Sequence, residues 1–255
     1  MSRKAHYPSL CERCVFITGG ATGIGAALVR SFALQNAKVA FVDLDADCAQ
    51  QLIEDLSSEG LGKPWFRRLD VTATDQLQCA IRDVATELGP LHTVVNNAAN
   101  DQRHTPAEMT PERWQQCMAV NLDASFFAAQ AGAELMQPNN AGSIINLGSI
   151  NALLGPANMP GYVTAKAGIN GLTKALAKDY GRYAIRVNAI LPGWVATERQ
   201  LQTWLTAEEE ARWMQQVAIK SRLMPEDIAN VALFLAADDS KMISGQCFVV
   251  DAGRT

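Results

Sequence analysis

Strand-sized apolar runs alternate with helix-sized stretches along the whole chain, and this alternation restricts the possible fold more than any single residue does. The apolar runs predict strands at 14–18, 38–43, 65–69, 91–96, 143–147, 185–190 and 247–250. Helical patterns fill the intervals at 25–36, 47–58, 73–88, 111–136, 161–182, 197–222 and 225–237. Repeated βα units with buried strands indicate a parallel sheet covered by helices on both faces. We therefore expect one α/β domain over residues 1–255, a Rossmann-type doubly wound sheet of about seven strands.

The composition fits a globular protein and argues against several other classes. The chain has 255 residues, of which 48% are hydrophobic, and a formal net charge of −4. Lys and Arg do not cluster, so we expect no nucleic-acid partner. The apolar runs are too short to cross a membrane, and residues 1–8 lack the apolar stretch of a secretory signal. We expect a cytoplasmic protein that does not bind membranes.

Six cysteines are scattered along the chain, which is more typical of buried thiols than of a disulfide framework. Cys11 and Cys14 form a CxxC that could indicate a metal or redox site. No second CxxC or histidine pair accompanies it, and the three histidines are far apart in the sequence. We expect no metal and interpret the CxxC as structural or incidental.

The first predicted strand ends in TGGATGIG at 18–25 and leads directly into a helix. Glycines permit a tight turn and a close backbone approach, and a helix N-terminus offers N–H groups to a pyrophosphate. An ordinary strand-to-helix turn is the alternative. Asp43 ends the second strand, where a carboxylate can bind the hydroxyls of an adenosine ribose and repel a 2′-phosphate. No Lys or Arg lies in the glycine loop, so we expect NAD and disfavour NADP.

Asp43 has a competing interpretation, because Asp45 and Asp47 follow it and the cluster could cap the next helix. Asp47 fits the cap position better, so we assign Asp43 to the cofactor. Further candidates follow the third and fourth strands, at the sheet edge where open α/β folds bind ligands: Asp70, Val71, Asn97 and Ala98.

Tyr162 and Lys166 stand four residues apart in a predicted helix, so their side chains share one face. A neighbouring cation favours the phenolate and lowers the pKa of tyrosine, which suits it to proton transfer. Such pairs are also common by chance, usually on a solvated face with a half-buried ring. The pair is a candidate acid/base unit, and Ser149 lies a short distance upstream.

Together these features resemble the short-chain dehydrogenase/reductase family along essentially the whole chain. The matching motifs are TGGATGIG at 18–25, Asp43, DV at 70–71, NNAA at 96–99, VNL around Asn121, Ser149, YVTAK at 162–166, RVNAILPG at 186–193 and the ending SGQCFVVDAG. One departure is Ala99, where the family usually has glycine. The added methyl slightly restricts the backbone and draws attention to the loop that follows.

The resemblance implies a catalytic set and a list of cofactor contacts. Tyr162 would exchange a proton with the substrate oxygen, and Ser149 would bind that oxygen. Lys166 would bind the nicotinamide ribose and lower the pKa of Tyr162, and Asn121 would hold a water on a proton path. A buried amide for Asn121 and a turn hydroxyl for Ser149 are the alternatives. The implied cofactor contacts are Gly19, Thr22, Gly23, Ile24, Gly25, Asp43, Asp70, Val71, Asn97, Ala98, Tyr162, Lys166, Pro192, Gly193, Val195 and Thr197.

The loop at 97–104 is dense in hydrogen-bonding groups, which suits a polyol substrate better than a sterol or an acyl chain. A solvated capping loop is the alternative. The stretches NNAANDQRHT, AVNLDASFFAAQ, NLGSINALLG and PGWVATERQLQTWLTAEEEA look like those of bacterial sugar 1-dehydrogenases of the D-xylose and L-arabinose type. That likeness implies oxidation of a cyclic aldose at C1 to a lactone. The expected substrate contacts are Asn100, Arg103, His104, Ser149, Asn151, Tyr162 and Trp194.

Two other functions stay open at this point. One is an NAD(P)-dependent secondary-alcohol or ketone oxidoreductase for another small polar substrate, and the other is a non-catalytic NAD-binding protein. Helices 111–137 and 161–182 carry much apolar and small-residue surface, and relatives assemble through these helices. An ordinary core face is the alternative. We expect a homotetramer.

Overall fold

The strands of the computed structural model, which describes residues 5–255, form one parallel seven-stranded sheet in the order β3-β2-β1-β4-β5-β6-β7. Residues 1–4, part of the segment expected to lack a secretory signal, lie outside the described range. The strands are β1 (Cys14–Thr18), β2 (Lys38–Asp43), β3 (Trp65–Arg68), β4 (Leu91–Asn96), β5 (Gly142–Leu147), β6 (Ile185–Pro192) and β7 (Cys247–Val250). Strands β1, β5 and β6 are buried at every position, which explains their continuous apolar runs.

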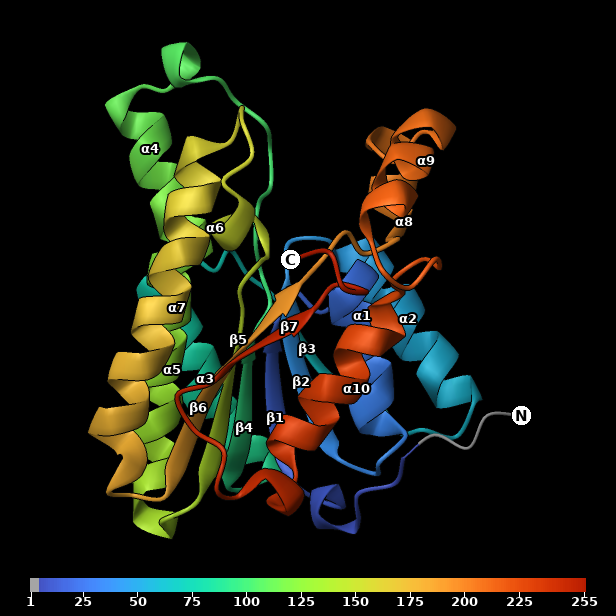
Figure 1. Ribbon diagram of the computed structural model, residues 1–255. Coiled ribbons are helices and arrows are strands. Elements are labelled where there is room, and N and C mark those ends of the chain that lie inside the picture. Colours follow the sequence, from blue (N-terminus) through green and yellow to red (C-terminus); the bar gives the residue numbers. More distant parts are fainter. Residues whose placement is uncertain (1–4) are drawn as a thin grey trace.

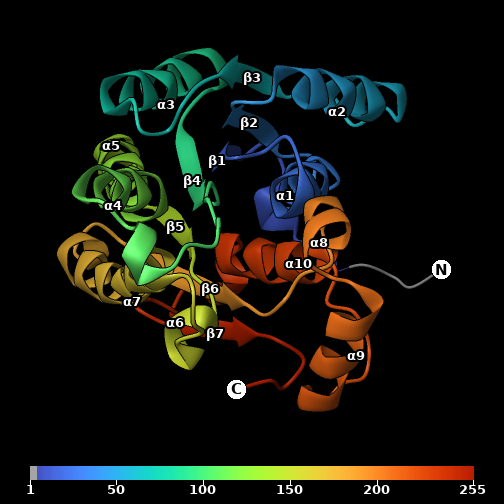
Figure 2. The same ribbon diagram turned by 90° about the horizontal axis from the view of Figure 1, so that it is seen from above.

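Helices cover both faces of the sheet, so the predicted fold class is confirmed. Helices α1, α2 and α10 pack on one face, and α3, α5 and α7 pack on the other (Figures 1 and 2). The helices are α1 (Gly23–Ala33), α2 (Ala46–Ser58), α3 (Thr74–Leu88), α4 (Pro111–Met118), α5 (Ala124–Met136), α6 (Asn151–Leu154), α7 (Pro160–Gly181), α8 (Glu198–Thr203), α9 (Ala207–Gln216) and α10 (Pro225–Ala236). Fully buried Phe32 and Phe41 lie in the first apolar layer, and Ile81 and Met136 lie in the second.

The direction of winding reverses at β1, because the chain passes from β3 at one edge back to β4 on the other side of β1. The hydroxyl of Thr18 accepts hydrogen bonds from the backbone N–H groups of Asn97 and Ala98, at 3.0 and 3.1 Å. The amide of Asn97 donates to the carbonyl of Gly19 at 2.7 Å. These bonds fasten the loops after β1 and β4 together at the point where open α/β sheets bind ligands.

The helix expected at 111–136 is interrupted, which corrects the prediction. A π-helical turn at Ala119–Asp123 separates α4 from α5. Asn121 lies in this turn, is 1% exposed, and donates from Nδ2 to the carbonyls of Cys117 and Asn100 at 3.0 and 3.1 Å. The side chain thus joins the turn to the loop after β4.

The polar helix expected at 197–222 is also wrong, since this stretch forms the two short helices α8 and α9. Thr197 caps the first, and Thr206 caps the second, each accepting a hydrogen bond from a backbone N–H of its helix. Both helices lie beyond the carboxyl edge of the sheet, on the opposite side of the molecule from α4 and α6 (Figure 1). Two internal caps explain why the helical pattern is divided.

Candidate active site

A cleft of about 1670 Å³ opens at the carboxyl edge of the sheet. Its lining includes the glycine loop, Asp43, the loops after β3 and β4, Tyr162 and α8. A pocket for one small molecule usually has about 300–1,000 Å³, so this cleft has room for a dinucleotide and a second ligand.

The glycine loop has the shape that a pyrophosphate requires. Gly19 and Gly23 have φ values of +66° and +53°, which favour glycine. A Cβ on Gly25 would lie 1.7 Å from the carbonyl oxygen of Gly19, so no side chain fits at that position. Thr22 makes no side-chain cap to α1 and lines the cleft with the first residues of the helix. The free N–H groups of this first turn suit an anion.

Asp43 lines the cleft and also holds the glycine loop in place. Its Oδ2 accepts a hydrogen bond from the N–H of Ala21 at 2.9 Å, and its Oδ1 accepts one from Asp45 at 3.1 Å. Asp45, and not the expected Asp47, caps α2 by accepting from the N–H of Cys48 at 2.9 Å. Asp47 falls inside the first turn of the helix, where it cannot cap.

The loop after β3 supplies the next part of the lining. Asp70 accepts hydrogen bonds from the N–H and the hydroxyl of Thr72, at 2.9 and 2.7 Å, which orders the turn. Val71 is 7% exposed beside it. Both residues line the cleft, as expected, together with Asn97 and Ala98.

Tyr162 and Lys166 lie on α7, and the expected catalytic residues gather around them. The Nζ of Lys166 is 5.8 Å from the ring centroid of Tyr162 and donates to the carbonyl of Leu147 at 2.7 Å. Ser149 follows β5, and its hydroxyl accepts a hydrogen bond from the N–H of Asn151 at 3.1 Å. Tyr162 and Asn121 line the cleft, whereas Ser149 and Lys166 are buried and lie outside its lining.

The expected direction of the tyrosine pKa is corrected by the structure. Burial raises the pKa of Tyr162 well above its ordinary value, and the charge of Asp101 raises it further, while hydrogen bonding with Ser149 lowers it. Burial also lowers the pKa of Lys166 to about 8. Desolvation is the largest cause of both shifts, because both side chains are enclosed by protein. Tyr162 therefore carries its proton at neutral pH.

Three of the expected substrate residues line the cleft and are already engaged with the protein. Asn100 exchanges backbone hydrogen bonds with the side chain of Asn121. The Nε2 of His104 accepts from the N–H of Gly161 at 3.2 Å, so its Nδ1 carries the proton and donates to Gln102 at 3.0 Å. The guanidinium of Arg103 lies 4.3 Å from the ring centre of Trp204.

Other expected site residues lie outside the lining of the cleft. Asn151 directs its amide to the sulfur of Met159 at 3.5 Å, and the indole N–H of Trp194 donates to Gln200 at 2.8 Å. Among the cofactor candidates at the end of β6 and after it, only Thr197 lines the cleft, and three others do not: Pro192, Gly193 and Val195. Thr197 also approaches the glycine loop, since a Cβ on Gly23 would lie 3.1 Å from its methyl group.

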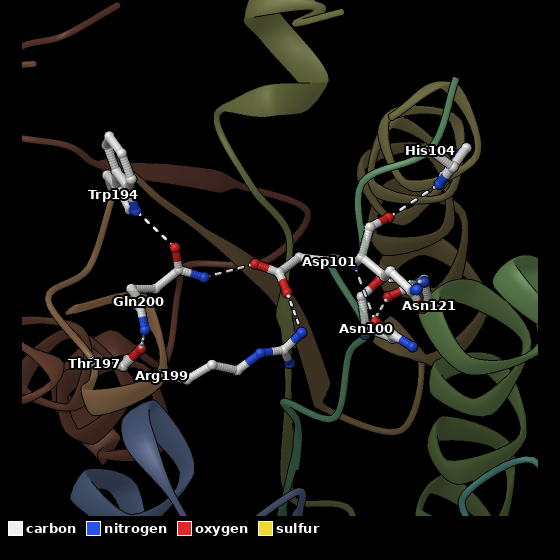
Figure 3. A network of polar contacts seen from close by, with 9 residues as sticks. Asn100, Asp101, His104, Asn121, Trp194, Thr197, Arg199 and Gln200 are labelled. Atoms are coloured by element: carbon white, nitrogen blue, oxygen red, sulfur yellow. Dashed lines mark hydrogen bonds and ion pairs between the residues drawn. The ribbon is translucent and has the colours of Figure 1, made fainter. Parts of the chain in front are cut away.

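Asp101 and Gln200 are two of the polar cleft residues that the sequence did not single out. Asp101 forms an ion pair with Arg199 at 3.0 Å and accepts a hydrogen bond from Gln200 at 2.7 Å, which connects the loop after β4 to α8 (Figure 3). The dense polar loop was the only signal for Asp101 in the sequence. Nothing in the local pattern of α8 points to Gln200, because its partner lies 99 residues away.

The CxxC lies away from the cleft. Cys11 is exposed and Cys14 is buried in β1, where burial raises the pKa of its thiol to about 12. Within residues 5–255, no group of three His, Cys, Asp or Glu side chains is placed to hold a metal ion. Over the same range, no helix has both the length and the apolar character needed to span a bilayer.

The chain matches known dehydrogenases and reductases over nearly its whole length. The family model described as enoyl-(acyl carrier protein) reductase matches residues 19–255. A "probable galactose dehydrogenase" of Rhizobium meliloti is 43% identical over 98% of this chain and 97% of its own. A D-xylose 1-dehydrogenase of Caulobacter vibrioides is 41% identical over 98% of each chain.

Solved structures show the same architecture. The 3-oxoacyl-[acyl-carrier protein] reductase of Brucella melitensis superimposes with a TM-score of 0.89 at 33% identity, covering 97% of this chain and 92% of its own. Members of the short-chain dehydrogenase/reductase family normally use NAD or NADP. With full-length identity above 40% and a matching fold, the chain belongs to the short-chain dehydrogenase/reductase family of oxidoreductases.

Proposed function

We propose that this protein is an NAD-dependent aldose 1-dehydrogenase, which oxidises a cyclic pentose or a related sugar at C1 to the lactone. The observation that carries the proposal is the polar wall of the cleft beside Tyr162, formed by the loop at 100–104 and by α8. Hydroxyl-rich substrates match such a wall, whereas an acyl chain would leave its polar groups unpaired. The two sugar dehydrogenases among the relatives support the same substrate class.

Tyr162 acts on the anomeric hydroxyl in this proposal. Its phenolate takes the hydroxyl proton while Ser149 binds the same oxygen, and the charge of Lys166 favours the phenolate. Bound NAD supplies the acceptor for the C1 hydride. Asn121 keeps the loop after β4 in position through its bonds to Asn100. The proposed cofactor contacts are the residues of the glycine loop, Asp43, Asp70, Val71, Asn97, Ala98, Tyr162, Lys166, Pro192, Gly193, Val195 and Thr197.

The acid–base state of Tyr162 gives the reaction a pH dependence. Because burial raises the pKa of the phenol, the phenolate is the minor form at neutral pH. The rate of sugar oxidation should therefore increase as the pH rises from 7 to about 8, where Lys166 starts to lose the charge that favours the phenolate, and the rate of the reverse reduction should not increase. Initial rates in both directions across this range provide the measurement.

A substrate panel tests the proposal directly. Initial rates with pentoses, hexoses, secondary alcohols and acyl ketones, each with NAD and NADP, should be highest for an aldose with NAD. The structural match to a 3-oxoacyl reductase makes ketone reduction the second candidate, and the same panel measures it. No oxidation of any aldose would reject the proposal.

A variant of Tyr162 separates an enzyme from a protein that only binds the cofactor. Y162F should lower turnover by at least about 100-fold and leave NAD affinity nearly unchanged. Tyr183 lies with Arg182 away from the cleft, so Y183F is the matched control and should keep full turnover. Persistent turnover in Y162F would refute the assigned base.

We also propose that the protein is a homotetramer assembled through helices 111–137 and 161–182. In support, α5 and α7 lie side by side on one face of the sheet, and the rings of Phe126 and Phe127 on α5, which meet edge to face, are only partly buried. Their centroids are 5.2 Å apart. Light scattering coupled to size exclusion should give four times the chain mass, and a monomer mass would refute the proposal.

A further inference from the structure

Asp101 is a carboxylate on the cleft wall that the proposed chemistry does not use. Its side chain is 28% exposed and lines the same cleft as Tyr162. One oxygen forms an ion pair with Arg199 at 3.0 Å, and the other accepts a hydrogen bond from Gln200 at 2.7 Å. Figure 3 shows the carboxylate between these two donors. Gln200 is itself held, since its Oε1 accepts from the indole of Trp194 at 2.8 Å. Asp101 is therefore a positioned group.

The contacts of Asp101 leave capacity for a ligand. A carboxylate has about four acceptor sites, of which Gln200 occupies one, while Arg199 forms an ion pair with the other oxygen. Acceptor sites therefore remain on a side chain that lines the cleft. The side chain of Arg199 is 58% exposed, so water screens it and the ion pair by itself contributes little to stability. Asp101 can therefore hold α8 and still accept hydrogen bonds from a ligand.

The charge of Asp101 also reaches the catalytic pair. It raises the pKa of Tyr162 and that of Lys166, and Tyr162 lines the same cleft as Asp101. A substrate whose reacting carbon meets Tyr162 would place its more distant groups within reach of this wall. Such a substrate displaces water from Asp101, and this is costly unless the substrate supplies hydrogen-bond donors.

On the basis of the proposed function, we propose that Asp101 determines substrate specificity by accepting hydrogen bonds from sugar hydroxyls remote from C1. These bonds orient the ring so that the anomeric hydroxyl meets Tyr162. Substrates without hydroxyl donors leave the remaining acceptor sites of the carboxylate without a partner and are rejected. The residue accordingly selects polyhydroxylated substrates over acyl ketones and simple alcohols.

Deoxy sugars combined with substitution of Asp101 test the proposal. For the best aldose, at least one monodeoxy analogue should show a kcat/KM about 10- to 100-fold lower with the wild-type protein. D101A should lower kcat/KM for the parent sugar by a similar factor and cause no further loss with that analogue. The KM for NAD should stay within about twofold of the wild-type value, since Asp101 does not hold the cofactor.

R199A is the matched control, because it breaks the ion pair and keeps the carboxylate. It should retain the discrimination between the parent sugar and the deoxy analogue. D101N keeps the size and one acceptor oxygen, and provides the same comparison if circular dichroism shows that D101A is misfolded. Equal losses in D101A for the parent sugar and every analogue would overturn the inference and leave the proposed function standing. Absence of aldose oxidation in the wild-type protein would instead reject the proposed function, and the inference with it.

Discussion

Replacing Lys166 by methionine should remove a gain in stability that the wild-type protein shows in mildly alkaline solution. The amine is 3% exposed, and burial lowers its pKa from the ordinary 10.5 to about 8. Its nearest hydrogen-bond acceptor is the neutral carbonyl of Leu147, which does not offset the cost of a buried charge.

The sign of the effect follows from proton binding. Between pH 8 and 10.5 the unfolded chain holds a proton on Lys166 that the folded protein has lost, so the free energy of unfolding increases with pH in this window. At about 1.4 kcal/mol per pH unit, the full interval corresponds to about 3 kcal/mol, of which about 2 kcal/mol should appear between pH 8 and 9.5. The raised pKa of Tyr162 acts in the opposite direction above pH 10, where unfolded tyrosine ionises.

Urea unfolding followed by circular dichroism, at fixed protein concentration and at pH 7.5 to 9.5, measures the effect. K166M should lack the rise of about 2 kcal/mol that the wild-type protein shows. Lys174 is exposed on the same helix, so K174M is the control and should follow the wild-type profile. A rise of equal size in K166M and in the wild-type protein would refute the reasoning, since burial of Lys166 would then not be its source.

Three further predictions concern the loop, the cofactor and the core. G25A should weaken NAD binding and lower the melting temperature, because its methyl group would overlap Gly19. In G171A the added methyl group meets nothing within 4 Å, so the free energy of unfolding should increase by up to about 1 kcal/mol. Fluorescence titration measures NAD binding, and thermal unfolding measures the stability of both variants. D43S should reduce the preference for NAD over NADP by about tenfold or more, and an unchanged ratio of kcat/KM values would contradict the ribose role. N146A should lower the free energy of unfolding by about 2–4 kcal/mol in a denaturant titration, because it removes buried hydrogen bonds to Asn96 and Thr173, each 2.9 Å long. A loss below about 1 kcal/mol would contradict this, since neighbouring groups would then have replaced the lost hydrogen bonds.

The order of strands and helices could be predicted because its signals are local. Buried strands read as apolar runs, and the glycines after β1 mark a turn that only a close backbone approach explains. The shared face of Tyr162 and Lys166 follows from helical spacing alone. The pKa of Tyr162 cannot be predicted from this spacing, because it depends on how completely the fold encloses the ring.

Features that depend on distant partners could not be predicted. The π-helical turn is joined through Asn121 to Asn100, and helical periodicity does not report a contact of this kind. Asp101 pairs with Arg199 and accepts a hydrogen bond from Gln200, and both residues lie about a hundred positions further along the chain. The N-cap of α2 is Asp45, two residues before the predicted Asp47, because sequence patterns define helix boundaries poorly.

The π-helical turn adds one residue to the α4–α5 connection without turning α4 relative to α5, because five residues of a π-turn cover about the same angle as four residues of an α-helix. Deleting one residue from Ala119–Asp123 would therefore restore regular α-helical pairing and keep α4 and α5 nearly in phase. Asn121 would lose its place in the wide turn, and the loop after β4 would lose its attachment while the sheet kept its core. The extra residue thus serves the cleft and not the packing of the helices.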